Sequence, residues 1–352
     1  MNFFENLTVD NQAVKDLKEL IPLSIMQDED FNKYIHLVPA KDGERFGFIG
    51  DMNDVGIAGS GCDPEYQEVG VANSEKIWSL GDWQIPIKIC YESLKGTIAE
   101  YSLKTGTDIA DLTSTEFMSY ILRPALETAM KRMIWRFGWF GDKAASDITG
   151  GGVIKDGVNV NLFKTCDGLF KRLLTQIAAN PAQRTTIAAN AQATFALQKS
   201  TMLVKGTATG IMDTMLMDAD SRITEDAGSI VLMTKLFADA LHHDIKERFN
   251  LQLKWETIFS GFDVAEYDGV KIARISIWDR FIRAYENDGT KLNNPYRAVF
   301  ANPDQLLVGA PASGLMSDLD IWFEKKERRN YIYSTGKMGT LIKENDMFHF
   351  GV

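Results

Sequence analysis

The longest regular pattern of apolar and polar positions lies between residues 113 and 142. Apolar side chains recur there at steps of three and four residues, which places them along one side of a helix. Gly138 and the aromatic cluster after it mark the end of the pattern. We therefore predict one long amphipathic helix over residues 113–137, bent at Pro124 because proline removes a backbone hydrogen bond inside a helix.

Strict alternation, the second pattern, covers residues 83–91. One face carries only large apolar side chains, which are Trp83, Ile85, Ile87, Ile89 and Tyr91. Such alternation is typical of a strand with one face buried. Pro86 lacks a backbone donor, so we expect an edge strand or one with a bulge.

Shorter patterns predict the remaining elements. Asp268 and Gly269 separate two apolar runs, which indicates a β-hairpin whose second arm runs towards Trp278. The other expected elements are a flexible joint at 150–152, a helix near 169–177, a strand at 229–233, a helix capped by Thr234, a strand at 296–300 and short β pieces in the tail. Residues 181–224 fit no single pattern.

Two segments lack the pattern of a compact core. Residues 44–81 are rich in glycine, which disfavours helix and indicates an extended two-stranded excursion, with a flexible surface loop as the alternative. Residues 1–43 carry few apolar side chains and must lie on another surface. That surface is either their own body or a neighbouring molecule, and we favour the neighbour.

Composition and charge narrow the class of protein. The chain has 352 residues, 45% hydrophobic and 24% charged, as expected for a folded protein with real cores. Its formal net charge of −10 argues against a dedicated nucleic-acid binder, because affinity for phosphate needs clustered cations. The three cysteines are far apart, so we expect neither a disulfide framework nor a thiolate metal site. No signal peptide or membrane span is indicated.

Candidate chemistry is sparse. The segment around Lys337 lacks the glycine and the hydroxyl of a phosphate-binding loop. His242 and His243 are adjacent, so on a helix they cannot hold one metal ion together. The run that begins at Asp218 lacks the acidic twelfth position of a calcium loop. We predict no catalytic, cofactor-binding or metal residue, no cofactor and no enzyme, although a carboxylate site assembled only in three dimensions stays open.

Taken in order, the predicted parts resemble the major capsid protein of tailed bacteriophages, whose coat fold encapsulins share. The resemblance covers most of the chain and depends on the order of parts, without a short catalytic motif. The segments that carry it are the strand-to-helix passage 83–142, the joint and helix before Asn180, the hairpin YDGVKIARISIWDR, and YRAVFANPDQLLVGA with the tail after it.

The resemblance implies an α+β fold with named parts. These are an N-terminal arm (1–43), an extended E-loop (44–92), a peripheral domain (93–164) on the spine helix 113–137, an axial domain (165–318) whose hairpin returns to the peripheral domain, and a β-rich return to the peripheral domain (319–352). In such shells the arm and the E-loop lie across adjacent subunits. Our candidates for packing between subunits are Phe46, Phe48, Trp78 and Trp83, with an ordinary place in the chain's own core as the alternative.

The resemblance also implies a function. The chain would assemble with itself into hexamers and pentamers of an icosahedral shell around double-stranded DNA, bound without sequence specificity. Portal, scaffolding or decoration proteins would be further partners, no membrane would be involved, and the shell would assemble in the host cytoplasm to become the virion capsid. The alternatives are an encapsulin-like compartment and a soluble α+β enzyme with a carboxylate site.

Overall fold

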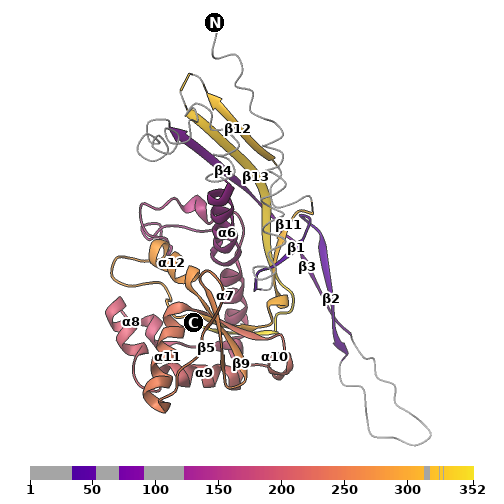
Figure 1. Cartoon of the computed structure of the whole chain (residues 1–352). Helices are drawn as coiled ribbons and strands as arrows, with labels where there is room; N and C mark the ends of the chain where they lie inside the picture. Colours follow the sequence, from indigo (N-terminus) through magenta and orange to yellow (C-terminus); the bar gives the residue numbers. More distant parts are fainter. Residues whose placement is uncertain (1–33, 53–70, 91–122, 313–317, 325, 328) are drawn as a thin grey trace, which may run out of the picture.

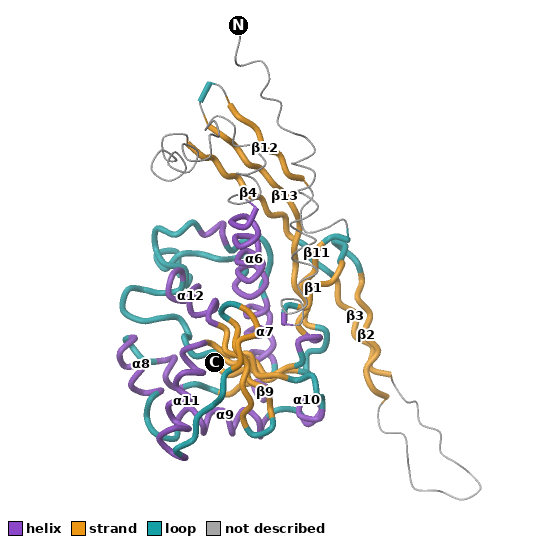
Figure 2. Tube along the Cα trace, in the orientation of Figure 1, coloured by secondary structure: helices purple, strands orange, loops and turns teal. Residues whose placement is uncertain are grey.

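The computed structural model describes residues 34–52, 71–90, 123–312, 318–324, 326–327 and 329–352. Their strands form a seven-stranded sheet, a five-stranded sheet and a two-stranded ribbon. Helices surround the seven-stranded sheet, while the five-stranded sheet and the ribbon project from this helical body in different directions (Figures 1 and 2). The described chain is therefore a compact lobe with two β extensions, an α+β fold as expected.

The five-stranded sheet is centred on the long strand β13. It comprises β1 (His36–Pro39), β4 (Gly81–Cys90), β11 (Leu306–Ala310), β12 (Asp318–Glu324) and β13 (Arg329–Ile342). β4 pairs antiparallel with β13, with Trp83 opposite Gly336 and Pro86 opposite Tyr333. Within the described residues β4 has no second partner strand, which confirms the edge position predicted from Pro86.

The two-stranded ribbon consists of β2 (Arg45–Met52) and β3 (Val71–Ile77), which pair antiparallel with Phe46 opposite Lys76. It extends away from the body of the molecule (Figure 1). The two-stranded excursion predicted from the glycine-rich segment is thus confirmed. Residues 53–70, between the two strands, lie outside the described part.

The seven-stranded sheet is buried on both faces. Its order is β5 (Arg184–Thr185), β14 (Phe348–Gly351), β10 (Ala298–Ala301), β6 (Ile230–Thr234), β9 (Val270–Ile275), β8 (Phe262–Tyr267) and β7 (Glu256–Phe259). Along β6, Ile230 and Leu232 face one apolar cluster while Val231 and Met233 face the other. A strand covered on both sides reads as continuous apolar sequence, as β6 does.

Helices cover the two faces of this sheet. One cluster contains side chains of α6 (Arg123–Phe140), α7 (Leu169–Ala179) and α12 (Ser276–Tyr285). The other contains side chains of α8 (Phe195–Met202), α9 (Thr207–Asp218), α10 (Ser221–Glu225) and α11 (Lys235–Phe249). Short 3-10 turns lie between the longer elements: η2 (Val160–Leu162), η3 (Pro181–Gln183), η4 (Ala188–Ala191) and η5 (Pro303–Gln305). Residues 181–224, which the sequence left unassigned, are therefore largely helical.

The helix α6 is the described part of the predicted long helix. Residues 113–122 lie outside the described part, and Pro124 is the second residue of the described helix, so the predicted bend is untested. The helix ends at Phe140, three residues beyond the predicted end, because it continues through Gly138. A Cβ atom at Gly138 would lie 3.4 Å from Cγ2 of Val308, an ordinary van der Waals distance, so α6 lies against β11 at this residue.

The hairpin at Asp268 and Gly269 is confirmed, with φ of 48° and 77° at these residues as a tight primed turn requires. Its second arm ends at Ile275 instead of reaching Trp278, because α12 begins at Ser276. The hairpin pairs with β6 in the seven-stranded sheet. It does not join the sheet that contains β4, and the domain to which the hairpin belongs stays a prediction.

The tail divides between the two sheets. β12 and β13 join β4, whereas β14 pairs with β10 in the seven-stranded sheet. The return of residues 319–352 to a peripheral domain stays a prediction. All four residues of β14 are buried, and a strand of this length carries too short a pattern to assign it to either sheet.

Two further expectations need correction. The end of the arm lies on its own chain, because β1 pairs in parallel with β11 and the Tyr34 ring lies 4.1 Å from the Phe262 ring. The predicted contact of the arm with a neighbouring molecule is wrong for these residues, and residues 1–33 lie outside the described part.

The flexible joint predicted at 150–152 is a hydrogen-bonded turn, in which Gly152 N donates to Asp147 O at 2.8 Å.

Candidate assembly site

The β2–β3 ribbon has two strand edges whose backbone hydrogen-bonding groups no other described strand pairs with. Each of its strands pairs only with the other within the described residues, so both outer edges keep backbone donors and acceptors free for another strand. The side chain of Ile77, near its base, is 60% exposed. Because an isolated two-stranded hairpin is marginal in water, such a ribbon gains stability from a partner.

The base of the ribbon is anchored to the body. Lys76 Nζ donates to Ile342 O at 2.5 Å and to Asn345 Oδ1 at 2.6 Å. Burial lowers the pKa of Lys76, and the nearby Arg172 lowers it further. Leu80 N donates to Asp42 Oδ1 at 2.9 Å on the other side of the base. These bonds hold the ribbon in one direction relative to the sheets.

The four predicted contact residues have different positions. Trp78 and Trp83 are 3% and 4% exposed and lie in the chain's own apolar clusters, so their own chain covers them. Phe46 is half-buried and packs against the cluster around Trp78. Phe48 lies opposite Ser74 in the ribbon. Packing between subunits therefore remains a prediction for Phe46 and Phe48, and the exposure of Ile77 is a finding of the structure.

Buried carboxylates were the basis of the enzyme alternative, and those in the described residues have structural partners. Asp244 Oδ2 accepts from Thr209 N at 2.9 Å and so caps α9 near its start. Asp263 Oδ2 accepts from Arg274 Nη2 at 2.7 Å. Carboxylates that bind backbone amides or an arginine are already satisfied and serve the fold.

Asp279 is a buried carboxylate whose acidity is altered. Burial raises its pKa to about 6, although its two backbone hydrogen bonds act in the opposite direction. Those bonds come from Lys235 N at 2.5 Å and Leu236 N at 3.0 Å. Asp279 thus caps α11, a role that the sequence assigned to Thr234, whose side chain makes no capping bond.

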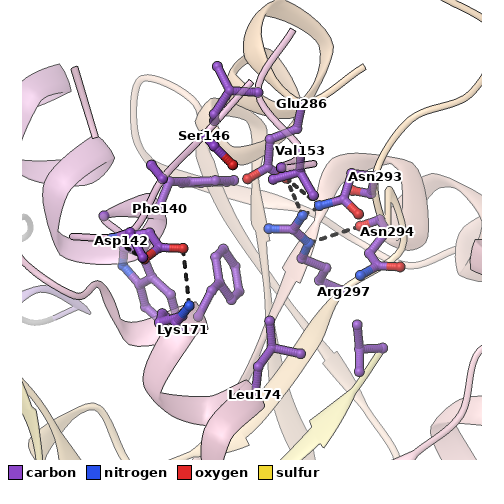
Figure 3. A pocket seen from close by; sticks show the side chains of 18 of the residues that line it. Phe140, Asp142, Ser146, Val153, Lys171, Leu174, Glu286, Asn293, Asn294 and Arg297 are labelled. Atoms are coloured by element: carbon purple, nitrogen blue, oxygen red, sulfur yellow. Dashed lines mark hydrogen bonds and ion pairs between the residues drawn. The ribbon is translucent and has the colours of Figure 1, made fainter. Parts of the chain in front are cut away.

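A pocket of about 430 Å³ lies between the loop after α6, the start of α7 and the segment after α12 (Figure 3). Glu286 and Arg297 form a buried ion pair in its wall. At the opposite side Lys171 Nζ lies 3.2 Å from Asp142 Oδ2. The pocket holds paired charges and aromatic rings, without the unpaired acid and base that acid–base catalysis requires.

The weaker motifs also have structural explanations. His243 Nε2 lies 3.6 Å from Glu247 Oε1 on the surface of α11. Asp220 caps α10 and pairs with Arg222 at 2.9 Å. Cys166 is buried, which raises its pKa to about 12, while Cys62 lies outside the described part. Across the described residues, no cluster of three His, Cys, Asp or Glu side chains is placed to hold a metal ion.

Membrane insertion receives no support from the described helices. None of them combines the length and the apolar character that crossing a bilayer demands.

The sequence matches no protein-family model and no curated protein. The structure, in contrast, aligns with a chain of the satellite phage P4 procapsid that includes the size determination (Sid) protein. The TM-score is 0.52 at 12% identity, over 95% of this chain and 98% of that one. It also aligns with a chain of Mycobacterium phage Ogopogo, with a TM-score of 0.50 at 12% identity over 91% and 90% of the two chains. The chain therefore has the α+β fold of phage capsid proteins, as the resemblance implied.

Proposed function

We propose that this chain is the major capsid protein of a tailed bacteriophage and assembles with itself into hexamers and pentamers of an icosahedral shell around double-stranded DNA. The observation that carries the proposal is the anchored β2–β3 ribbon, which leaves the body with two outer edges that no other described strand pairs with. A ribbon held in one direction by Lys76 can reach a neighbouring copy and complete its hydrogen bonding there. The capsid-protein fold supports the same conclusion.

The charge of the chain fits a container for DNA. With a formal net charge of −10, its surface does not hold phosphate tightly, so contact with the packaged DNA is local and independent of sequence. The proposal includes portal, scaffolding or decoration proteins as further partners, assembly in the host cytoplasm and a place in the virion capsid.

An encapsulin-like compartment is the second candidate, since the same ribbon would serve a shell that encloses a cargo protein. The nucleic acid content of purified particles separates the two. Nuclease-resistant double-stranded DNA inside the particles supports the capsid, and protein cargo without DNA supports the compartment. A soluble enzyme is the least supported candidate, because the described buried carboxylates cap helices or pair with arginines.

Sedimentation of the full chain tests whether assembly depends on the ribbon. Ile77→Asp places a charge on the exposed apolar surface at the base of the ribbon, so the variant should stay unassembled with an unchanged circular dichroism spectrum. The control Ile77→Val keeps an apolar side chain and should sediment as the native protein does. Assembly of the Asp variant at the native concentration dependence would contradict a role of the ribbon.

A further inference from the structure

A second pocket, also of about 430 Å³, lies at the base of the ribbon between β3, α7 and the end of β13. Three of its lining side chains are cations, Lys76, Lys171 and Arg172, whereas Asp167 is the one carboxylate among the described residues that line it. Lys171 is paired with Asp142 at 3.2 Å. This leaves two cations against one carboxylate, so the pocket has an excess of positive charge.

The two cations that make this excess are fixed in position. Lys76 Nζ donates to Ile342 O at 2.5 Å and to Asn345 Oδ1 at 2.6 Å. Arg172 Nε donates to Thr340 Oγ1 at 2.8 Å, and its two terminal nitrogens bond to no other described residue. The terminal edge of a guanidinium is the part that binds two oxygens of an oxyanion at once. That edge and the ammonium group are thus positioned before any ligand arrives.

Electrostatic effects show that negative charge would be favourable here. Burial lowers the pKa of Lys76 and of Arg172, because both cations lose part of their hydration. Repulsion from Arg172 lowers the pKa of Lys76 further, and this effect is larger than the opposite effect of either Glu344 or Asp346. Asp167 raises the pKa of Arg172, but less than burial lowers it. An anion between the two cations would relieve their repulsion.

The hydrogen-bonding groups of the pocket indicate the class of anion. Asn345 accepts from Lys76 through Oδ1, so its amide nitrogen remains a donor. Asp167 Oδ1 is already occupied, because it accepts from Lys143 N at 3.0 Å. Donors therefore come from three side chains, which carry a guanidinium, an ammonium and a carboxamide. A phosphate group has enough oxygens to accept from all three, and it matches the fork of an arginine.

We propose that this pocket binds a phosphate group between Arg172 and Lys76, with the amide nitrogen of Asn345 as a third donor. The inference goes beyond the proposed function and does not depend on it, because binding needs only the folded chain. A free phosphate ion and the phosphodiester of DNA share this chemistry. If DNA is the source, the pocket is a local cationic contact on a chain whose formal net charge is −10.

Equilibrium dialysis of the full-length chain against radiolabelled inorganic phosphate, at constant ionic strength, tests the inference. We expect one saturable site per chain. Thr175→Glu places a carboxylate in the lining from an exposed position on α7, where it competes with phosphate for Arg172, and should weaken binding by about tenfold or more. Thr175→Gln has nearly the same shape without the charge and should bind as the native chain does. Binding that does not saturate, or equal affinity of the two variants, would overturn the inference.

A second pair of variants tests the arginine itself. Arg172→Gln should lose most of the phosphate binding, whereas Arg280→Gln, at an exposed position on α12 outside the pocket lining, should keep it. Equal binding by these two variants would also overturn the inference.

A short DNA duplex added to the dialysis separates the two sources of phosphate. Displacement of the labelled phosphate by the duplex identifies the phosphodiester of DNA as a ligand of the pocket. Retention of the labelled phosphate identifies the free ion as the ligand.

Discussion

The ammonium group of Lys76 donates a hydrogen bond to Asn345 Oδ1 at 2.6 Å and thereby ties the base of the β2–β3 ribbon to the loop after β13. The same group reaches Ile342 O. Lys76→Met removes both bonds, and a typical net value of about 1 kcal/mol for each predicts roughly 5- to 30-fold faster amide exchange in β3. Hydrogen-exchange mass spectrometry of the unassembled chain measures this rate.

Lys88→Met is the control for this prediction, because Lys88 is exposed on β4, away from the base of the ribbon. We expect native exchange in β3 for this variant. If Lys76→Met exchanged as slowly as the control, the anchor would have no role in orienting the ribbon.

Asp279 makes stability depend on pH in a specific direction. Its pKa is raised to about 6 in the folded chain, so between about pH 4 and 6 the folded state binds more protons than the unfolded state. The contribution of Asp279 to the free energy of unfolding is complete below pH 4. It falls by about 3 kcal/mol in total as the pH rises through 6. The free energy of unfolding relative to Asp279→Asn should therefore be larger at pH 4.5 than at pH 7.5. Urea titrations at both values measure it, and the opposite order would show that the folded pKa is depressed.

Gly81 is required by close backbone packing. A Cβ atom at this residue would lie 1.6 Å from Thr165 O, so Gly81→Ala forces β4 away from the segment before α7. We expect a loss of roughly 3 kcal/mol or failure to fold. Gly47→Ala on β2 meets no atom within 4 Å and should stay within about 0.5 kcal/mol of the native chain. Thermal unfolding of the two variants compares them, and equal melting temperatures would contradict the packing described at Gly81.

The ion pair of Glu286 and Arg297 should be costly to break. Both side chains are under 10% exposed, so Glu286→Gln leaves a buried positive charge uncompensated and should cost about 3–5 kcal/mol of unfolding free energy. Asp82→Asn, which disrupts the exposed pair with Lys337, should cost about 1 kcal/mol or less. Guanidinium titrations compare the unfolding free energies of the two variants, and a Glu286→Gln variant as stable as Asp82→Asn would refute the buried pair.

Periodic segments could be read directly from the sequence. The alternation that begins at Trp83 predicted β4, and the Asp268–Gly269 pair predicted the β8–β9 hairpin, because in both cases local geometry decides the structure. The helix around Met130 and Ile134 likewise followed from its apolar side, although it ends at Phe140, three residues beyond the predicted end.

Long-range pairings could not be read in this way. β14 is a strand of four residues that is buried on both faces, so nothing local distinguishes the seven-stranded sheet from the five-stranded one. The cap of α11 comes from Asp279, more than 40 residues away, instead of the adjacent Thr234. The pocket around Arg297 also combines segments far apart in the sequence. Such sites depend on tertiary structure, which local patterns do not encode.

Electron microscopy of the purified full-length chain, in negative stain, tests the central claim most directly. The account predicts closed shells of uniform diameter whose surface shows rings of six and five subunits. A species of 39.4 kDa that stays monomeric at every concentration, with no rings or shells on the grid, would contradict it.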